Sequence, residues 1–464
     1  MKLLENKDLK IALLFLPLYL NYGFNFLNNN GFDKLINFNY YNLFVTVVFF
    51  LFLFLIGKSI KKSTKLNTVS ISIITYIFSF FLLDNLLLFI TTELKLYQIF
   101  MITNLIWFIY LLVISREYKF SLSSLFTYFV LNFFSNKFLN NLITDSNIIG
   151  DVYDFHYPHV KNIYEQGFYF SVNNAVLEGY PQFLNYIQAL LNNIIINLDN
   201  YIYLGPSTNI LYFLTALLFV EVGFNRNINL IMIGTFTIFI FNSEWLKFLF
   251  LDSLMVEGLV AYLFATILTS IHNSIKSKTN LSYIIFTLFG LLYLTKQFIS
   301  LITLVMLILF FYKKNYRVFI PFGFSGFIIQ EISYRTFFSG LEKNYHLKEI
   351  DLKDTLLDFI FFRDLNLTNI ITIIKNLFVD KPLTYILLIF FLLLFFEFYR
   401  NSFSDFAFTS NVMSILLNFI FIFALYVSIW RNMELESPIR YMLSFFHITF
   451  ITIFNMANKL FSKQ

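Results

Sequence analysis

The sequence predicts an all-α protein, a polytopic bundle of about 14 membrane-spanning helices. Hydrophobic residues make up 58% of its 464 residues and charged residues only 13%, whereas soluble domains hold roughly 45–50% apolar and about 25% charged residues. Apolar runs recur along the whole chain, without the alternation of apolar and polar residues that is typical of membrane strands. Because backbone groups in lipid must be hydrogen-bonded internally, these runs are predicted to be helices.

The candidate spans are apolar runs separated by short polar stretches. The first follows several lysines but has no small-residue cleavage site after it, so we interpret it as a spanning helix and not as a secretory signal. The run 183–198 contains several Asn and Gln residues and is predicted to be an amphipathic helix at the membrane interface. In chain order, the predicted spans are residues 11–27, 40–57, 68–90, 97–114, 121–143, 204–223, 228–243, 253–271, 281–295, 297–312, 317–335, 383–399, 410–430 and 439–457.

Lysine and arginine are concentrated in the short loops between these runs. Basic loops of this kind remain in the cytoplasm, so both termini are predicted to be cytoplasmic, and two long loops, about 144–203 and 336–382, to be external. The net charge of +5 is therefore interpreted as a signal of orientation and not as a nucleic-acid surface. The chain has no cysteine, which excludes disulfides, thiolate catalysis and cysteine-based metal sites.

The first long loop holds the residues that are most informative about chemistry. Two of the five histidines fall within four positions there, in a chain that is otherwise very apolar. Pro158 is typical of the first turn of a helix and Gly167 of a helix end, so a short helix is predicted over about 158–166. An acidic, solvated loop that begins with a helix cap is the simpler interpretation. The polar members of the cluster are Asp151, Asp154, His156, His159, Glu165 and Glu178.

The order of these residues resembles the first external loop of the GT-C superfamily, a group of polytopic membrane glycosyltransferases. The superfamily includes the protein O-mannosyltransferases and the lipid A aminoarabinose transferases. The resemblance rests on Asp151, on the run Asp154-Phe155-His156-Tyr157-Pro158, on Lys161, on Glu165-Gln166-Gly167 and on Tyr180-Pro181.

Three later features fit the same family, in the same order along the chain. They are Asp252 at the start of a predicted helix, Thr295-Lys296-Gln297 between two predicted helices, and Ser437-Pro438-Ile439-Arg440-Tyr441 at the start of the last one. The resemblance covers about 140–457. The chain is therefore divided into N-terminal added transmembrane helices, residues 1–120, and a GT-C-like membrane domain, residues 121–464. The added helices have no counterpart in the simplest family plan.

The resemblance implies transfer of a sugar from a polyprenyl-phosphate donor to a glycan, lipid or protein acceptor. The expected site lies on the external, periplasmic side of a bacterial inner membrane. The acceptor hydroxyl must lose a proton, so Asp151 is the expected general base, and Asp252 is the second acidic residue of the site. The leaving phosphate gains charge, which Lys296 and Arg440 are expected to stabilise. The remaining residues expected to bind substrate are Asp154, His156, His159 and Tyr441.

Several alternatives stay open at this stage. His156 and His159 can share one helix face and hold a divalent metal ion with Asp151 or Asp154, or they can hydrogen-bond substrate and loop backbone. Lys296 can be a simple loop charge and Arg440 an anchor at the end of a helix. Asp84, within a predicted span, is expected to cap a helix or lie at the interface.

The chain as a whole also allows other functions. A transporter of lipid-linked glycans would show midplane charges, interrupted helices and a repeat. An envelope polysaccharide polymerase or ligase would share the donor but not the acidic and histidine-rich loop. A membrane scaffold without chemistry would leave that loop unexplained.

Overall fold

The computed structural model describes residues 40–64, 66, 68–115, 156–173, 183–195, 204–223 and 282–295, together with isolated residues between 259 and 270 and between 371 and 392. Within these ranges every regular element is a helix, as the sequence predicted. The helices are α4 (Tyr40–Thr64), α5 (Val69–Leu87), α6 (Leu96–Ser115), α8 (Tyr157–Gln166), α9 (Phe168–Asn173), α10 (Phe183–Ile195), α11 (Leu204–Gly223) and α15 (Ser282–Thr295).

Five predicted spans fall on helices α4, α5, α6, α11 and α15. In the described part of the chain, one helix, α5, is long and apolar enough to cross a membrane, and α6 contains a shorter apolar stretch, Leu96–Leu111. The other predicted spans lie wholly or largely outside the described residues, so the predicted number of spans stays a prediction.

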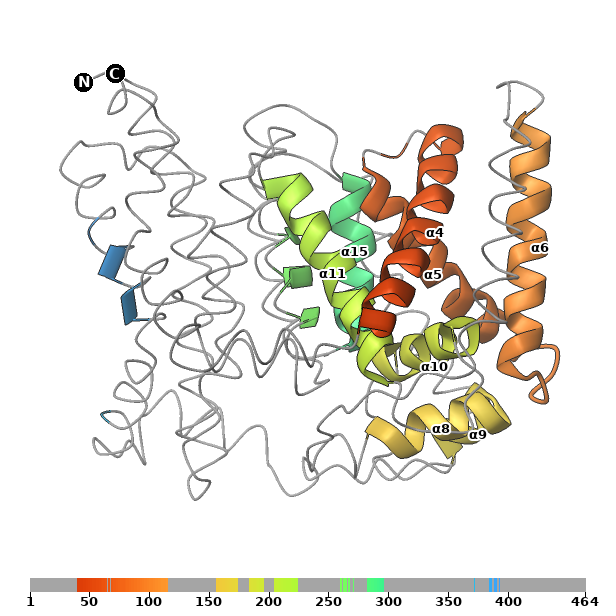
Figure 1. Ribbon diagram of the computed structural model, residues 1–464. Helices are drawn as coiled ribbons and strands as arrows, with labels where there is room; N and C mark the ends of the chain where they lie inside the picture. The colour runs from red at the N-terminus through yellow and green to blue at the C-terminus, as the bar shows by residue number, and fades with distance from the viewer. Residues whose placement is uncertain are drawn as a thin grey trace, which may run out of the picture.

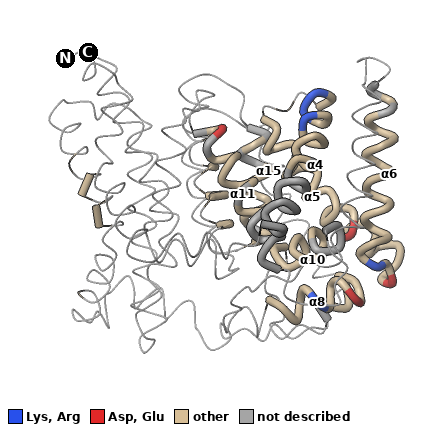
Figure 2. Tube along the Cα trace, in the orientation of Figure 1, with Lys and Arg blue, Asp and Glu red and all other residues tan. Residues whose placement is uncertain are grey.

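The helices α4, α5 and α11 pack against one another, and α10, which contacts α5, α11 and α15, crosses the lower end of the bundle (Figure 1). Below α10 lie α8 and α9, and α6 stands at the outer edge of the bundle (Figure 1). The lysines of the last turn of α4, Lys61 and Lys62, lie at the end of the bundle opposite α8 (Figure 2). The basic end and the histidine-bearing helix are thus on opposite sides of the bundle.

The helix α5 begins and packs through small and hydroxyl-bearing residues. The side chain of Thr68 caps it by accepting a hydrogen bond from the backbone N–H of Ile71 at 3.2 Å. Gly57 on α4 lets the two helices approach closely, because a Cβ atom there would collide with the side chain of Ile73 and lie 3.0 Å from the carbonyl oxygen of Val69. The α4–α5 pair therefore forms a tightly packed part of the bundle.

The helix α8 has the bounds that its local signals predict, to within one residue. Pro158 lies in its first turn, and Gly167 ends it with a φ of 97°. A Cβ atom on Gly167 would lie 2.7 Å from the carbonyl oxygen of Leu94, in the loop that joins α5 to α6. Glycine at this position therefore allows the α8–α9 corner to rest directly on the α5–α6 loop.

The predicted interfacial helix exists as α10, but its environment differs from the expectation. Every residue from Phe183 to Leu191 is buried, including the polar side chains of Asn185 and Gln188, which are each 1% exposed. The reason is that α8 packs against α10 on the side away from the bundle. Over Phe183–Leu191, the part whose side chains the structure describes, α10 is therefore an internal layer between the bundle and α8, with no exposed face.

Candidate active site

The layer between α8 and α10 holds a buried pair of polar side chains. Nδ1 of His156, at the start of α8, lies 2.8 Å from Oδ1 of Asn185 on α10. The two residues are 8% and 1% exposed. Because an amide oxygen only accepts hydrogen bonds, Nδ1 of His156 donates in this contact. Asn185 therefore fixes both the tautomer and the position of the His156 ring.

The next residue of α10 contacts α5 on the other side. The hydroxyl group of Tyr186 donates to the carbonyl oxygen of Phe80 at 3.2 Å and shares a hydrogen bond with the carboxyl group of Asp84. Asp84 is 3% exposed and Tyr186 is 0% exposed. We expected Asp84 to cap a helix or lie at the interface, but the structure buries it against α10. An ionisable residue buried in a spanning helix is by default a candidate for function.

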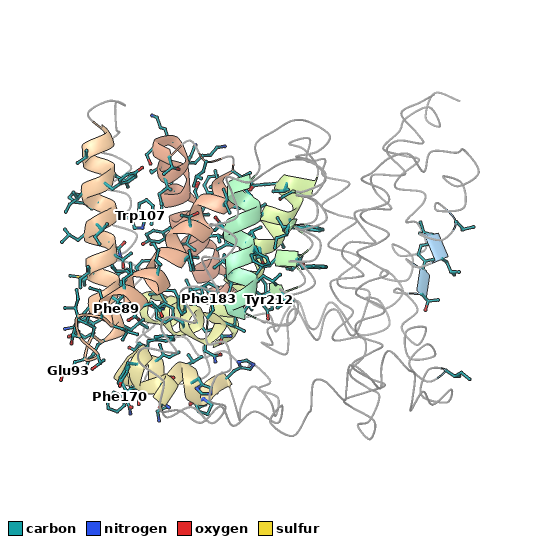
Figure 3. All side chains as sticks on the ribbon, turned by 180° about the vertical axis from the view of Figure 1, so that it is seen from behind. Phe89, Glu93, Trp107, Phe170, Phe183 and Tyr212 are labelled. Atoms are coloured by element: carbon teal, nitrogen blue, oxygen red, sulfur yellow. The ribbon has the colours of Figure 1, made fainter. Side chains whose placement is uncertain are left out.

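Aromatic rings surround this contact. The ring of Phe81 on α5 meets those of Phe168, Phe183 and Tyr186 edge-on, at centroid distances of 5.4, 5.3 and 5.1 Å. Phe183 lies at the start of α10, facing α5 (Figure 3). The rings keep water away from Asp84 and Tyr186, so the hydrogen bond between them forms in a medium of low dielectric constant, where it is strong.

His159, one turn further along α8, is buried without a hydrogen bond. It is 3% exposed, and neither ring nitrogen has a hydrogen-bonding partner in the described structure. Burial, and to a smaller extent the nearby His156, lower the pKa of His159 from 6.5 to about 4. The ring is therefore neutral at pH 7, with one N–H donor and one nitrogen acceptor.

The opposite side of α8 is charged and exposed. Nζ of Lys161 and Oε1 of Glu165 lie 4.0 Å apart, with both side chains more than a third exposed. An exposed pair of this kind contributes little to stability. Phe170 on α9 and Phe89 and Glu93 in the α5–α6 loop lie at the same corner of the molecule (Figure 3), and the two phenylalanines are 52% and 55% exposed.

The structure describes two of the site residues that the sequence predicts, His156 and His159. It places them on one helix, both buried against neighbouring helices. Among the described residues no group of three or more metal-ligating side chains occurs. A metal site at Asp151 and His156, one of the alternatives that the sequence leaves open, stays untested, because Asp151 lies outside the described residues. The predicted residues outside the described part are Asp151, Asp154, Asp252, Lys296, Arg440 and Tyr441.

Sequence reasoning missed Asn185 and Tyr186 as parts of the site. A signal was present, because Asn185 and Gln188 are three positions apart on a short helix that directly follows the histidine-bearing loop. We took these polar residues to be a solvated face.

No family model, curated protein or solved structure matches the chain. The interpretation of the site therefore rests on its own geometry and on the resemblance in the sequence motifs.

Proposed function

We propose that this protein is a polytopic membrane glycosyltransferase of the GT-C type. It moves a sugar from a polyprenyl-phosphate donor to a glycan, lipid or protein acceptor at the external membrane face. The observation that carries the proposal is the buried contact of His156 with Asn185. This contact joins the start of α8, which carries the motif residues, to α10, which lies directly under the helix bundle (Figure 1).

The membrane part of the proposal is supported by the outer surface of α6. Large apolar side chains are exposed along this helix, and lipid accommodates such a surface. Together with the span-length helix α5 they indicate a bilayer around this part of the bundle. The exposed side chains include Met101, Leu105, Ile106, Ile109 and Val113.

The orientation is supported by the position of charge. The lysines at the end of α4 lie on the side of the bundle opposite α8 (Figure 2). Basic ends remain in the cytoplasm, so α8, α9 and α10 belong to the external side. This is the side on which polyprenyl-linked donors meet acceptors outside the cytoplasm. The proposed location is the inner membrane of a bacterium.

The reaction requires four linked changes. Asp151 takes the proton of the acceptor hydroxyl, whose oxygen forms a bond to the anomeric carbon of the sugar. The bond from that carbon to the phosphate oxygen breaks, and its electron pair stays on the phosphate. Lys296 and Arg440 stabilise the added charge. Asp252 completes the acidic part of the pocket, and the products are the glycosylated acceptor and the polyprenyl phosphate.

The histidines bind substrate in this scheme. His156, held by Asn185, and the neutral His159 present ring nitrogens suited to sugar hydroxyls. Asp154 and Tyr441 complete the substrate-binding set. A divalent metal held by Asp151 and His156 is compatible with the same residues, because imidazole and carboxylate are common metal ligands.

The test is transfer of labelled sugar from a polyprenyl-phosphate donor by the purified chain. Asp151→Asn keeps the size of the side chain but removes its proton affinity, so turnover should fall by about 100-fold or more. Asp154→Asn is the matched control and should cost less, because asparagine caps a turn as well as aspartate does. Near-normal transfer by Asp151→Asn would remove the base from the proposal, and absence of transfer by the wild-type protein would refute the proposed function.

A further inference from the structure

The helix α10 makes buried contacts with two helices that are distant in sequence, α5 and α8. Asn185 contacts His156 on α8, and the adjacent Tyr186 contacts Asp84 and Phe80 on α5. Neighbouring residues on a helix point in different directions, about 100° apart. Asn185 and Tyr186 therefore form a two-sided link between the spanning helix and the loop that carries the proposed site.

We infer that Asp84 and Tyr186 are positioning residues, which set the place of His156 through Asn185. The inference deepens the proposed function and rests on it, since it assigns to a residue of the membrane bundle a part in aligning a substrate-binding histidine. Neither Asp84 nor Tyr186 is among the residues that the sequence motifs assign to the site.

The first support is the burial of all four side chains. Asp84, His156, Asn185 and Tyr186 are between 0% and 8% exposed. Solvent cannot replace a partner that is lost from such a contact, so each remaining group must move to find another. A displacement of Tyr186 therefore carries to Asn185, which is the next residue of the same rigid helix.

The second support is the packing around the link. Phe81 contacts both Phe183 and Tyr186, and Phe168 contacts Tyr186 at 5.6 Å. These rings come from α5, α9 and α10, so the link lies where three helices meet. Packed aromatic side chains resist small shifts, which makes the position of α10 depend on the hydrogen bonds that orient it.

A third observation shows that a simpler contact would suffice for docking. The same helix, α5, binds α6 through Tyr76, whose hydroxyl donates to Asn104 at 2.7 Å, with no ionisable acid involved. An aspartate buried against α10 is expensive to place in a spanning helix. Its presence on the α10 side is explained by a requirement for exact orientation of that helix.

The test is chemical modification of His156 by diethyl pyrocarbonate in the full-length protein, with each histidine measured by peptide mass spectrometry. Tyr186→Phe and Asp84→Leu should raise the rate of modification of His156 by about three- to tenfold, the range that the loss of one hydrogen bond allows. Asp84→Asn should stay near the wild-type rate, because a carboxamide can still bond with the tyrosine hydroxyl. His272, His346 and His447 are internal references in the same digest.

Tyr76→Phe is the matched control, because it removes one tyrosine hydrogen bond from the same helix on the side that packs against α6. It should leave the modification of His156 unchanged. In the transfer assay, Tyr186→Phe should raise the KM for the donor and lower kcat/KM, because it displaces a substrate-binding histidine, and Asp84→Asn should restore most of the rate that Asp84→Leu loses.

Two results would overturn the inference. One is an unchanged rate of His156 modification in Tyr186→Phe, and the other is an equal increase in Tyr76→Phe, which would mean general loosening of the bundle. The modification needs neither donor nor acceptor. A wild-type protein that transfers no sugar would thus refute the proposed function while the modification rates still decide whether Asp84 and Tyr186 position His156.

Discussion

The two sides of α5 are held to their neighbours in different ways. Toward α6, Tyr76 donates to Asn104 and the indole N–H of Trp107 donates to Ser79 at 2.8 Å, and all these groups are neutral. Trp107 points from α6 toward α5 (Figure 3). Neutral hydrogen bonds between small and polar residues are typical of helices that associate in membranes. The α5–α6 side is therefore explained by docking alone.

Toward α10 and α8, the contacts involve residues that can ionise. Asp84 and Tyr186 meet at the α5–α10 contact, and His156 and Asn185 meet at the α8–α10 contact. Removing ionisable groups from water is costly, and apolar residues of similar size would pack as well. The comparison indicates that the contacts of α10 with α5 and α8 meet a requirement beyond close packing. We assign that requirement to the proposed active site.

The largest expected effect is a pH dependence of stability that comes from His159 on α8. His159 has a pKa of about 4 in the folded protein, against 6.5 for an exposed histidine. The unfolded chain therefore takes up a proton first as the pH falls. The contribution of the neutral ring to stability is complete above about pH 6.5 and is lost as the pH falls toward 4, by about 3 kcal/mol at most.

His159→Leu should remove this part of the pH dependence. Leucine also leaves no ring nitrogen unpaired, so the variant should be as stable as the wild type at pH 7 or more so. The thermal midpoint of each protein is measured in detergent at pH 7 and pH 4.5. The drop between the two pH values should be smaller in His159→Leu than in the wild type. Equal slopes for the two proteins would show that the buried ring does not control the acid sensitivity.

Two glycine substitutions, one next to α8 and one between α4 and α5, should differ in their effect on His156. Gly167→Ala places a Cβ atom against the carbonyl oxygen of Leu94 at a positive φ, and should cost about 1–3 kcal/mol. The substitution should also loosen α8 and raise the modification rate of His156.

Gly57→Ala is the comparison on the α4–α5 side. Its new methyl group collides with Cγ1 of the β-branched Ile73 and lies 3.0 Å from the carbonyl oxygen of Val69. Overpacking should therefore lower stability there by about 1–3 kcal/mol. The modification rate of His156 should not change. If both glycine variants changed that rate equally, the corner formed by Gly167 and Leu94 would have no special part in holding α8.

The smallest effect belongs to the α5–α6 side. Trp107→Phe removes the indole hydrogen bond to Ser79 but keeps an aromatic ring, and should cost about 0.6 kcal/mol, the average for such bonds between membrane helices. Sugar transfer should stay at the wild-type level, as measured with the same donor. A strong loss of transfer would place α6 in the functional part of the molecule and remove the contrast between the two sides.

The parts of the fold that sequence predicts well are those with local signals. Pro158 and Gly167 fixed the bounds of α8 because a ring without an N–H and a residue free to take a positive φ act within one turn. The Asn and Gln residues within the apolar run 183–198 likewise predicted an amphipathic helix, because they are spaced along one short segment. Its burial was not predictable, because it depends on α8 folding back over α10.

The same limit applies to the site. His156 is a predicted site residue because of its neighbours in sequence, but its partner Asn185 lies on another helix. Asp84 carried a signal of function as an acid in an apolar run, yet its contact with Tyr186 depends on packing between helices that are distant in sequence. The roles of Asp151, Asp252 and Arg440 stay predictions that rest on the resemblance.

The most direct test of the difference between the two sides uses one substitution at two positions. Asn185→Leu removes the partner of His156, and Asn104→Leu removes the partner of Tyr76, a hydrogen bond of nearly equal length on the other side of α5. Transfer of labelled sugar from a polyprenyl-phosphate donor should fall by about 10- to 100-fold in Asn185→Leu, because a misplaced substrate-binding group costs this much. It should stay near the wild-type rate in Asn104→Leu. Equal rates in the two variants would contradict the assignment of the α8–α10 side to the active site.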